Sequence, residues 1–359
     1  MAPPVRPAAA SGWVLGVDSG GSGLRIALAD AATGTPVETV SSREPVRTGA
    51  SGIDAGHLLA QLLPAARELL ARVGATAAPR PDAPVPGGPA AGAELAAVAV
   101  GAAGMATLGD GLRSELPSAL ERALGVRRLA LAADAVTAYA GALGQRPGAV
   151  VAGGTGLIAL GTDLSAASGW RRADGWGHLL GDCGSGAWIG RAGLEAAMRA
   201  FDGRRGGSAA LLARAGAAFG TAADGLPGLL YPRSERPAVL ASFAPEVAAC
   251  ATDGDPVAAA VLARAAGHIA ETAAAVCPDP ASTEAECEVA LTGGLFKLGE
   301  PLLVPLRAEL AGQLPHARPV SAQGDPLTGA LRIASALATG ALRLPQDGGM
   351  LCVPAFQGS

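Results

Sequence analysis

Two stretches of the chain share one hydrophobic pattern, in which an apolar run, a glycine-rich turn and a second apolar run follow one another. The first stretch is Val14–Leu28, with Ser19–Gly23 as its turn, and the second is Ala149–Leu160, with Gly153–Gly156 as its turn. Each predicts a β-hairpin. Because glycine has no Cβ, backbone N–H groups in such turns can approach an anion closely. A single turn of this kind is equally typical of an ordinary hairpin, and the repetition favours two related phosphate-binding lobes.

The pattern elsewhere predicts a mixed α/β chain. Strands are expected at 36–42, 95–100, 129–132 and 288–291, and helices at 54–73, 111–124, 135–143, 301–314 and 327–338. Residues 185–277 are almost entirely helical in pattern, and the Pro/Ala/Gly-rich segment 76–93 predicts a surface loop. We therefore expect two α/β domains at 13–133 and 134–342, the second enlarged by helices, with tails at 1–12 and 343–359.

Composition narrows the class of protein. Half of the 359 residues are hydrophobic, and the formal net charge of −4 argues against a partner such as nucleic acid or an anionic membrane. No apolar run approaches the roughly 20 residues of a membrane helix, and residues 1–12 lack the apolar core of a signal peptide. The five cysteines form no CxxC pair, which indicates reduced thiols in a cytoplasmic protein.

Polar residues stand at two further places where chemistry is expected. Asp18 ends the first apolar strand beside the glycine turn, where it could hold a hydrated Mg²⁺. The stretch 174–190, DGWGHLLGDCGSGAWIG, sets Trp176 and Asp182 among glycines. In a sugar site a carboxylate accepts hydrogen bonds from ring hydroxyls, and an aromatic ring shapes the pocket. Core packing is the alternative for Trp176, and a structural role is the expectation for His178.

With these motifs the chain resembles the N-acetylglucosamine kinase and BadF/BadG/BcrA/BcrD ATPase family, the sugar-kinase branch of the actin/hexokinase/Hsp70 ATPase superfamily. The stretch 174–190 is similar to the family signature GGWGxxxGDEGS. A strand that ends in Thr292-Gly293-Gly294 resembles the family's adenosine-binding motif, and residues 325–331 resemble the helix start that closes that region. The resemblance implies a two-lobed actin-like (ribonuclease H-like) ATPase fold with a cleft between the lobes.

The resemblance also implies roles for individual residues. Asp134, between a strand and a helix, corresponds to the aspartate that takes the proton from the sugar hydroxyl in many of these kinases; helix capping is its alternative. Trp176, Gly177 and Asp182 would contact the sugar, and Asp18 would position Mg²⁺. The expected ATP contacts are Gly20, Gly21, Ser22, Gly154, Thr155, Gly156, Gly293 and Gly294.

Three departures from the family pattern affect the assignment of the sugar substrate more than the assignment of ATP binding. Cys183 replaces the glutamate that follows the signature aspartate. No aspartate follows Gly101–Gly104, where animal members carry their base, and Asp110 lies further on. The early asparagine that contacts the sugar is not evident near 47–49.

We therefore expect a kinase with ATP and Mg²⁺ as cofactors that phosphorylates an amino sugar, N-acetylglucosamine at its 6-hydroxyl above all, as a cytoplasmic homodimer. Two alternatives from other classes stay open. An ATPase activator of the BcrA/BcrD type would hold an iron–sulfur cluster on paired thiolates, for which the chain offers no close cysteine pair. A sugar-sensing, non-catalytic relative is the other.

Overall fold

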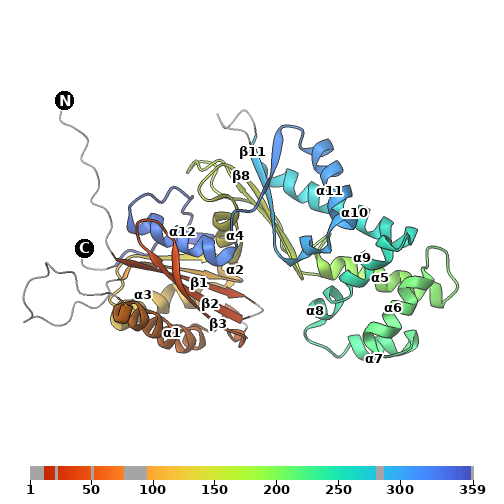
Figure 1. Ribbon diagram of the computed structural model, residues 1–359, viewed down its shortest axis with the longest axis horizontal. Helices are drawn as coiled ribbons and strands as arrows, with labels where there is room; N and C mark the ends of the chain where they lie inside the picture. Colours follow the sequence, from red (N-terminus) through yellow and green to blue (C-terminus); the bar gives the residue numbers. More distant parts are fainter. Residues whose placement is uncertain (1–11, 21–22, 50–51, 77–94, 280–286, 357–359) are drawn as a thin grey trace, which may run out of the picture. The chain divides into compact units, whose positions relative to one another are not determined.

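The computed structural model describes residues 12–20, 23–49, 52–76, 95–279 and 287–356. The chain forms two compact units (Figure 1). Unit 1 comprises Met1–Arg146, Leu164–Trp170 and Gln323–Ser359, and unit 2 comprises Pro147–Asp163 and Arg171–Ala322. Gly21, Ser22 and nearly all of the expected loop 76–93 lie outside the described residues.

Unit 1 is built on a six-stranded sheet with the order β13-β7-β6-β1-β2-β3. Its strands are β1 (Trp13–Gly20), β2 (Gly23–Asp30), β3 (Pro36–Ser42), β6 (Leu95–Ala102), β7 (Leu129–Ala133) and β13 (Leu351–Cys352). β1 and β2 form the predicted first hairpin, and β3 continues the meander. β1, β6 and β7 run parallel to one another, so their carboxyl ends share one edge of the sheet.

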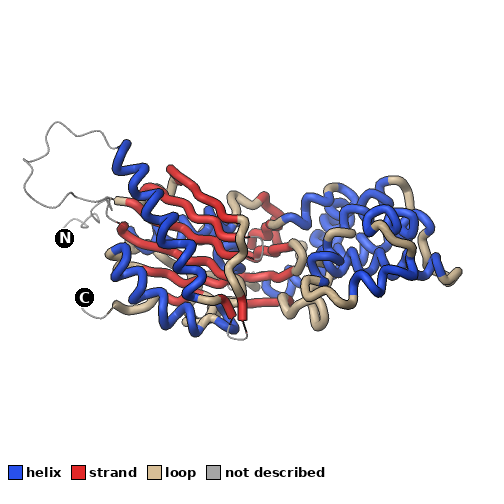
Figure 2. Tube along the Cα trace, turned by 90° about the horizontal axis from the view of Figure 1, so that it is seen from below, coloured by secondary structure: helices blue, strands red, loops and turns tan. Residues whose placement is uncertain are grey.

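Helices lie across the strands of this sheet (Figure 2). They are α1 (Ala55–Thr76), α2 (Met105–Leu108), α3 (Asp110–Leu124), α4 (Asp134–Leu143) and α12 (Pro326–Ala338); β4 (Thr48–Gly49) and β5 (Gly52–Ile53) form a separate ribbon. Asp54 starts α1 as predicted, since its Oδ1 accepts the N–H of His57 at 2.9 Å. α4 and α12 pack closely: a Cβ at Gly329 would overlap the carbonyl of Thr137 in α4, and one at Gly141 would overlap the carbonyl of Asp325, the N-cap of α12.

The boundaries of the two units differ from those expected at 133/134 and 342. Those boundaries assign α4 and α12 to the second domain, whereas both helices belong to unit 1. The physical reason is packing, because the buried face of α12 lies against α4 and against β1, where Leu331 fills the space beside Gly16. The chain thus returns to its first sheet after Ala322, a long-range contact that no local pattern reveals.

Unit 2 has a five-stranded sheet with the order β10-β9-β8-β11-β12. Its strands are β8 (Gly148–Gly153), β9 (Leu157–Thr162), β10 (Arg171–Asp174), β11 (Cys287–Thr292) and β12 (Ala317–Ser321). β8 and β9 form the second predicted hairpin, and β11 pairs in parallel with β8 and with β12. The periodicity did not predict the short strands β10, β12 and β13, and β13 lies in the tail 343–359, which carries no clear period.

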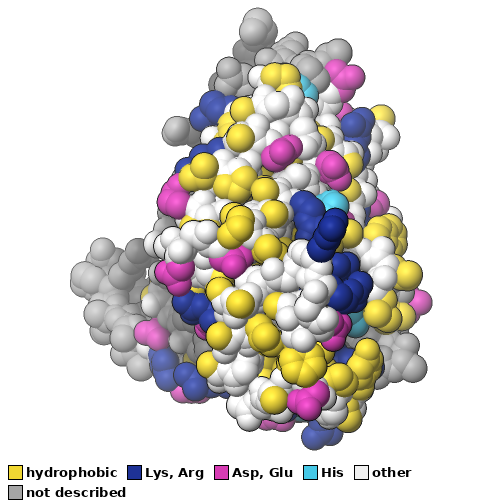
Figure 3. Space-filling model, turned by 90° about the vertical axis from the view of Figure 1, so that its right-hand side faces the viewer, with side chains coloured by type: hydrophobic (Ala, Val, Ile, Leu, Met, Phe, Trp, Pro, Cys, Tyr) yellow, Lys and Arg dark blue, Asp and Glu magenta, His cyan; other side chains and the backbone are white. Residues whose placement is uncertain are grey.

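The helices of unit 2 confirm the helical interpretation of residues 185–277. They are α5 (Gly186–Phe201), α6 (Ala209–Phe219), η1 (Ala223–Gly225), α7 (Leu226–Leu230), α8 (Arg236–Ala241), α9 (Ala244–Thr252) and α10 (Pro256–Val276), followed later by η3 (Gly294–Leu298) and α11 (Glu300–Gln313). Acidic and basic side chains both occur on the face that Figure 3 shows. Among the charged residues of unit 2, Arg214 of α6 forms ion pairs with Glu246 at 2.7 Å and with Asp253 at 2.9 Å.

The expectation of five reduced thiols is wrong for the structure. Cys277, at the end of α10, and Cys287, at the start of β11, form a disulfide, while Cys183, Cys250 and Cys352 are free. The two cysteines are ten residues apart in the sequence, a spacing that carries no motif. No helix in the described part of the chain is both long enough and apolar enough to cross a bilayer.

Candidate active site

Two of the predicted site residues lie at one edge of the unit 1 sheet. Asp18 of β1 stands opposite Gly101 of β6, and Gly101 stands opposite Ala132 of β7. Asp134 follows two residues after Ala132, at the start of α4. Neighbouring strands are about 4.8 Å apart, so the backbones at Asp18 and Ala132 are roughly 10 Å apart across the sheet, and Asp134 lies two residues further along the chain. The parallel strands therefore carry two carboxylates to the same edge.

The carboxylate of Asp18 is oriented by an arginine. Its Oδ2 accepts hydrogen bonds from Arg25 Nη2 at 2.6 Å and Arg25 Nε at 3.0 Å, and Arg25 Nη1 reaches Asp325 Oδ2 at 2.5 Å. Burial alone would raise the pKa of Asp325, but hydrogen bonds from Thr328 and the Arg25 charge hold that pKa below its ordinary value. Asp325 thus caps α12 inside unit 1, the alternative that a helix start at 325–331 also allows.

The donor set around Asp18 fits a hydrated magnesium ion. Over the residues that the structure describes, no group of three or more His, Cys, Asp or Glu side chains is placed to hold a metal. Mg²⁺ keeps several waters and is commonly bound by one or two carboxylates together with substrate phosphates. Asp18 alone could supply the protein ligand, and its role as a metal ligand remains a prediction.

Asp134 has an exposed side chain at the beginning of α4. Ala133 is the N-cap residue, and Asp134 Oδ1 accepts the N–H of Ala135 at 2.9 Å. The Thr137 hydroxyl donates to the main-chain carbonyl of Asp134 at 2.9 Å and fixes this first turn. The Asp134 residue therefore lies exposed in the first turn of α4.

In unit 2 the glycine turn of the second hairpin rests on the start of α5. The carbonyl of Gly154 accepts the N–H of Gly186 at 2.9 Å, and the carbonyl of Thr155 accepts the N–H of Ala187 at 3.0 Å. Gly154 has no neighbouring atom within 4 Å of the space that a Cβ would occupy. The start of α5 therefore fixes one side of the turn, and the side at Gly154 is open. An open glycine turn of this kind suits the binding of a phosphate group.

Asp182 lies directly against this turn. A Cβ at Gly156 would come 2.7 Å from Asp182 Oδ2, so only glycine leaves the carboxylate its place. The Asp182 residue is 9% exposed. Burial raises the pKa of Asp182, and hydrogen bonds from the backbone of Leu157 and Gly177 partly oppose that rise. The predicted sugar ligand and the predicted phosphate turn thus adjoin each other in one unit.

Asp174 is a site residue that the sequence reasoning did not find. Its Oδ1 accepts the N–H of Asp182 at 2.5 Å, and its Oδ2 accepts the N–H of Cys183 at 2.9 Å. Both Asp174 and Asp182 have a left-handed backbone, with φ of 59° and 53°. The available signal was the aspartate at the head of the glycine-rich stretch 174–190, which we did not weigh.

Trp176 is 61% exposed, so the alternative of core packing is wrong. The Arg172 guanidinium lies over its ring, 4.4 Å from the centroid. Leu179 and Leu180, on the same loop, are 81% and 86% exposed. Gly177 has φ of 84° and open space around its Cα. This loop therefore presents apolar surface to solvent beside Asp182.

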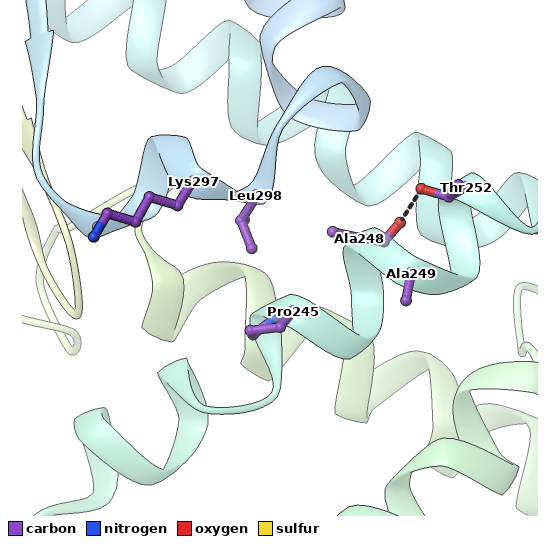
Figure 4. A pocket seen from close by; sticks show the side chains of 7 residues that line it. Pro245, Ala248, Ala249, Thr252, Lys297 and Leu298 are labelled. Atoms are coloured by element: carbon purple, nitrogen blue, oxygen red, sulfur yellow. Dashed lines mark hydrogen bonds between the residues drawn. The ribbon is translucent and has the colours of Figure 1, made fainter.

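The Thr292-Gly293-Gly294 motif lies against the same hairpin. Gly293 has φ of 102°, and a Cβ there would overlap the carbonyl oxygen of Gly153. A cavity of about 380 Å³ opens beside Gly294, between η3 and α9 (Figure 4). Its lining residues are Pro245, Ala248, Ala249, Thr252, Gly294, Lys297 and Leu298. The cavity combines an apolar wall with a single ammonium group, from Lys297, the one lysine of the sequence.

A continuous series of contacts thus joins the predicted unit 2 residues. It runs from Gly293 to Gly153, along the turn to Gly156, and from there to Asp182. The structure brings these residues together with Gly154, Thr155, Gly294, Trp176 and Gly177 in unit 2, whereas Asp18, Gly20 and Asp134 belong to unit 1.

Comparison with known proteins places the chain in a family. The sequence profile of the BadF/BadG/BcrA/BcrD ATPase family matches residues 15–334. A curated N-acetylmuramic acid/N-acetylglucosamine kinase of Clostridium acetobutylicum is 40% identical over 96 residues, which are 26% of this chain and 31% of that protein. The match therefore spans about a third of the length of that relative.

Solved structures show the same fold. A candidate N-acetylglucosamine kinase of Chromobacterium violaceum is 29% identical, with a TM-score of 0.52 over 90% of this chain and 98% of that one. A candidate N-acetylglucosamine kinase of Porphyromonas gingivalis is 16% identical, with a TM-score of 0.62 over the same shares, and this second likeness concerns the fold alone. The predicted actin-like ATPase fold is confirmed.

Proposed function

The chain belongs to the BadF/BadG/BcrA/BcrD ATPase family, and on this premise we propose that it transfers the γ-phosphoryl group of ATP to a hydroxyl of an amino sugar. The leading reaction converts N-acetylglucosamine to its 6-phosphate. The observation that carries the proposal is the contact between Asp182 and the Gly153–Gly156 turn, because it would set a hydroxyl acceptor beside the turn that we propose as the phosphate cradle.

ATP would bind along the hairpin turn and the neighbouring cavity. The open face at Gly154 leaves room for phosphate oxygens beside the backbone. The base would enter the cavity beside Gly294, whose apolar wall of Pro245 and Ala248 suits a flat ring. This arrangement supports the expected roles of Gly154, Thr155, Gly156, Gly293 and Gly294.

Asp182 would bind the sugar, and Trp176 would form one wall of the sugar pocket. A buried carboxylate is a strong acceptor for a ring hydroxyl, since charge-assisted hydrogen bonds are about twice as strong as neutral ones. The exposed Trp176 ring offers an apolar face for the C–H side of a sugar. Gly177 would let the sugar approach the backbone.

Asp134 would act as the general base, and Asp18 would position Mg²⁺. Asp134 is an exposed residue, and its carboxylate is the group that would accept the proton of the attacking hydroxyl. When bound, Mg²⁺ neutralises charge on the transferring phosphoryl group. The Arg25 bridge holds the Asp18 carboxylate in one orientation for that ion. Gly20, Gly21 and Ser22 would complete the phosphate contacts of the first hairpin.

The setting of the reaction is also a proposal. We place it in the cytoplasm, where ATP is available, and in a homodimer. The name of the curated relative includes both N-acetylmuramic acid and N-acetylglucosamine. If the sugar site of this chain is built like that of the relative, N-acetylmuramic acid is a second acceptor. Neither the iron–sulfur activator nor the non-catalytic sugar sensor is favoured by an observation in the structure.

The test is ADP release over a panel of acceptors. Purified protein with Mg²⁺–ATP is given N-acetylglucosamine, glucosamine, N-acetylmuramic acid, glucose or no sugar, and ADP is measured by a coupled assay. We expect fast release with at least one amino sugar and slow release without sugar. Equal rates with and without every sugar would contradict the proposal and point to a sugar-independent ATPase.

A further inference from the structure

We propose that Asp174 is a positioning residue that fixes the backbone at Asp182 and thereby holds the Asp182 carboxylate against Gly156. We call the two hydrogen bonds from the N–H groups of Asp182 and Cys183 to the Asp174 carboxylate the Asp174 bridge. The inference rests on the proposed function only in so far as Asp182 binds the sugar.

The backbone geometry is the first support. Asp174 and Asp182 both have positive φ, a conformation that L-residues other than glycine adopt uncommonly. Such residues persist only where surrounding contacts determine them, and they gather at functional sites. In the described residues, only Leu164 shares this property among non-glycine residues, and it lies in unit 1. The two left-handed aspartates of unit 2 are directly joined by the Asp174 bridge.

The bridge closes a tight loop. Each carboxylate oxygen of Asp174 accepts one hydrogen bond, from the N–H of Asp182 or from the N–H of Cys183. The side chain therefore joins the two ends of the loop between residues 174 and 183. Gly181 lies so close that a Cβ there would overlap Asp174 Oδ1 and come 3.0 Å from Trp176 Cβ. Any side chain at 181 would therefore displace the carboxylate from its two partners.

Asp174 is itself held in place by the sheet and by Arg172. Asp174 ends β10, where it pairs with Ile158 of β9. Arg172 donates from Nε to the carbonyl of Asp174 at 3.2 Å and from Nη2 to the carbonyl of Gly175 at 2.7 Å. The bridge therefore transmits the fixed position of the β9–β10 pair to Asp182.

Three substitutions distinguish the effect of the Asp174 carboxylate from the effect of the left-handed backbone at residue 174. Asp174→Gly removes both acceptors but tolerates positive φ. Asp174→Asn keeps the shape and one acceptor oxygen. Gly181→Ala leaves every carboxylate in the sequence and breaks the bridge by volume alone. Gly312→Ala is the matched control, because a Cβ at this helical position of α11 meets nothing within 4 Å.

The kinetic readout is the sugar KM against kcat. We expect Asp174→Gly and Gly181→Ala to raise the sugar KM by roughly tenfold or more, the effect of losing a hydrogen bond to a charged group. The sugar KM of Asp174→Asn should lie between that of these two variants and that of the wild type. The ATP KM of all three variants should stay within about twofold of the wild-type value. Gly312→Ala should match the wild type throughout.

A double variant tests whether Asp174 acts through Asp182. If it does, Asp174→Gly adds nothing to the sugar KM once Asp182→Asn is present, because coupled sites are not additive. A full additive rise in the double variant would overturn the positioning role, since Asp174 would then act by another route.

Amide hydrogen exchange provides a readout that needs no activity. The N–H groups of Asp182 and Cys183 should exchange faster in Asp174→Gly than in the wild type, with α10 amides unchanged as the folding control. Unchanged protection would overturn the bridge. Lost protection with an unchanged sugar KM would overturn the positioning role while leaving the kinase proposal intact. If no sugar is phosphorylated by the wild type, the kinase proposal fails and the exchange experiment still decides the bridge.

Discussion

Asp182 and Gly156 are packed so closely that a Cβ on Gly156 would lie 2.7 Å from Asp182 Oδ2. We predict that Gly156→Ala raises the sugar KM by at least about tenfold, because the methyl group moves the carboxylate that accepts the sugar hydroxyl. Steady-state kinetics with varied sugar at saturating ATP measure the effect. Gly156 does not need positive φ, so the change acts by volume and not by backbone strain.

Gly267→Ala in α10 is the control for that experiment, since a Cβ at Gly267 meets nothing within 4 Å. It should keep the wild-type sugar KM. A Gly156→Ala enzyme with an unaltered sugar KM would show that Asp182 does not bind the sugar in this place.

The contact of Gly293 with Gly153 predicts a nucleotide phenotype. Gly293→Ala must accept φ of 102° and an overlap with the Gly153 carbonyl oxygen, so we expect the turn to shift. ADP affinity measured by calorimetry should fall by roughly tenfold or more, the usual cost of misplacing one good contact. Retention of wild-type ADP affinity in a folded Gly293→Ala protein would remove this motif from the nucleotide site.

The raised pKa of Asp182 predicts a pH-dependent stability. Burial makes the folded protein bind this proton more tightly than the unfolded chain does. The free energy of unfolding therefore loses the contribution of Asp182 as the pH rises through the raised pKa, and keeps it below the ordinary aspartate pKa. Asp182→Asn should gain Tm relative to the wild type as the pH rises from below the ordinary aspartate pKa to neutral, as thermal unfolding measures. A difference that stays constant or narrows with rising pH would speak against a buried, charged Asp182.

The disulfide predicts a thiol count. Under denaturing conditions without reductant, the protein should show three reactive thiols, from Cys183, Cys250 and Cys352, and five after reduction. Titration with a chromogenic disulfide reagent distinguishes the two states. Protein isolated with reductant should show five until it is oxidised. Five thiols after complete air oxidation would exclude the Cys277–Cys287 bond.

Local pattern was enough to predict the two hairpins and the strand–helix junction to which we assign phosphate chemistry. Both hairpins follow from an apolar run that meets a glycine turn, and Asp134 follows from the junction of a buried strand with a helix. These features depend on residues close in sequence. The helical region after Ser185 was predictable for the same reason.

Features that depend on distant contacts were not predictable. α12 packs on β1, some 300 residues earlier in the chain, and its cap residue Asp325 pairs with Arg25. β10 is four residues long and reads RRAD, which has no apolar alternation to signal a strand. The Asp174 bridge needs two left-handed residues, a conformation that the sequence marks only weakly through aspartate.

Transfer of the γ-phosphoryl group to the sugar is the central claim, and a radiolabel tests it most directly. Protein with Mg²⁺ and [γ-³²P]ATP is mixed with N-acetylglucosamine, and the label is followed in a single turnover. We predict that the label appears in N-acetylglucosamine 6-phosphate, and that Asp134→Asn slows this step by about 10²- to 10⁴-fold, the usual share of a general base. Label released as inorganic phosphate, or a transfer rate in Asp134→Asn equal to that of the wild type, would contradict the account.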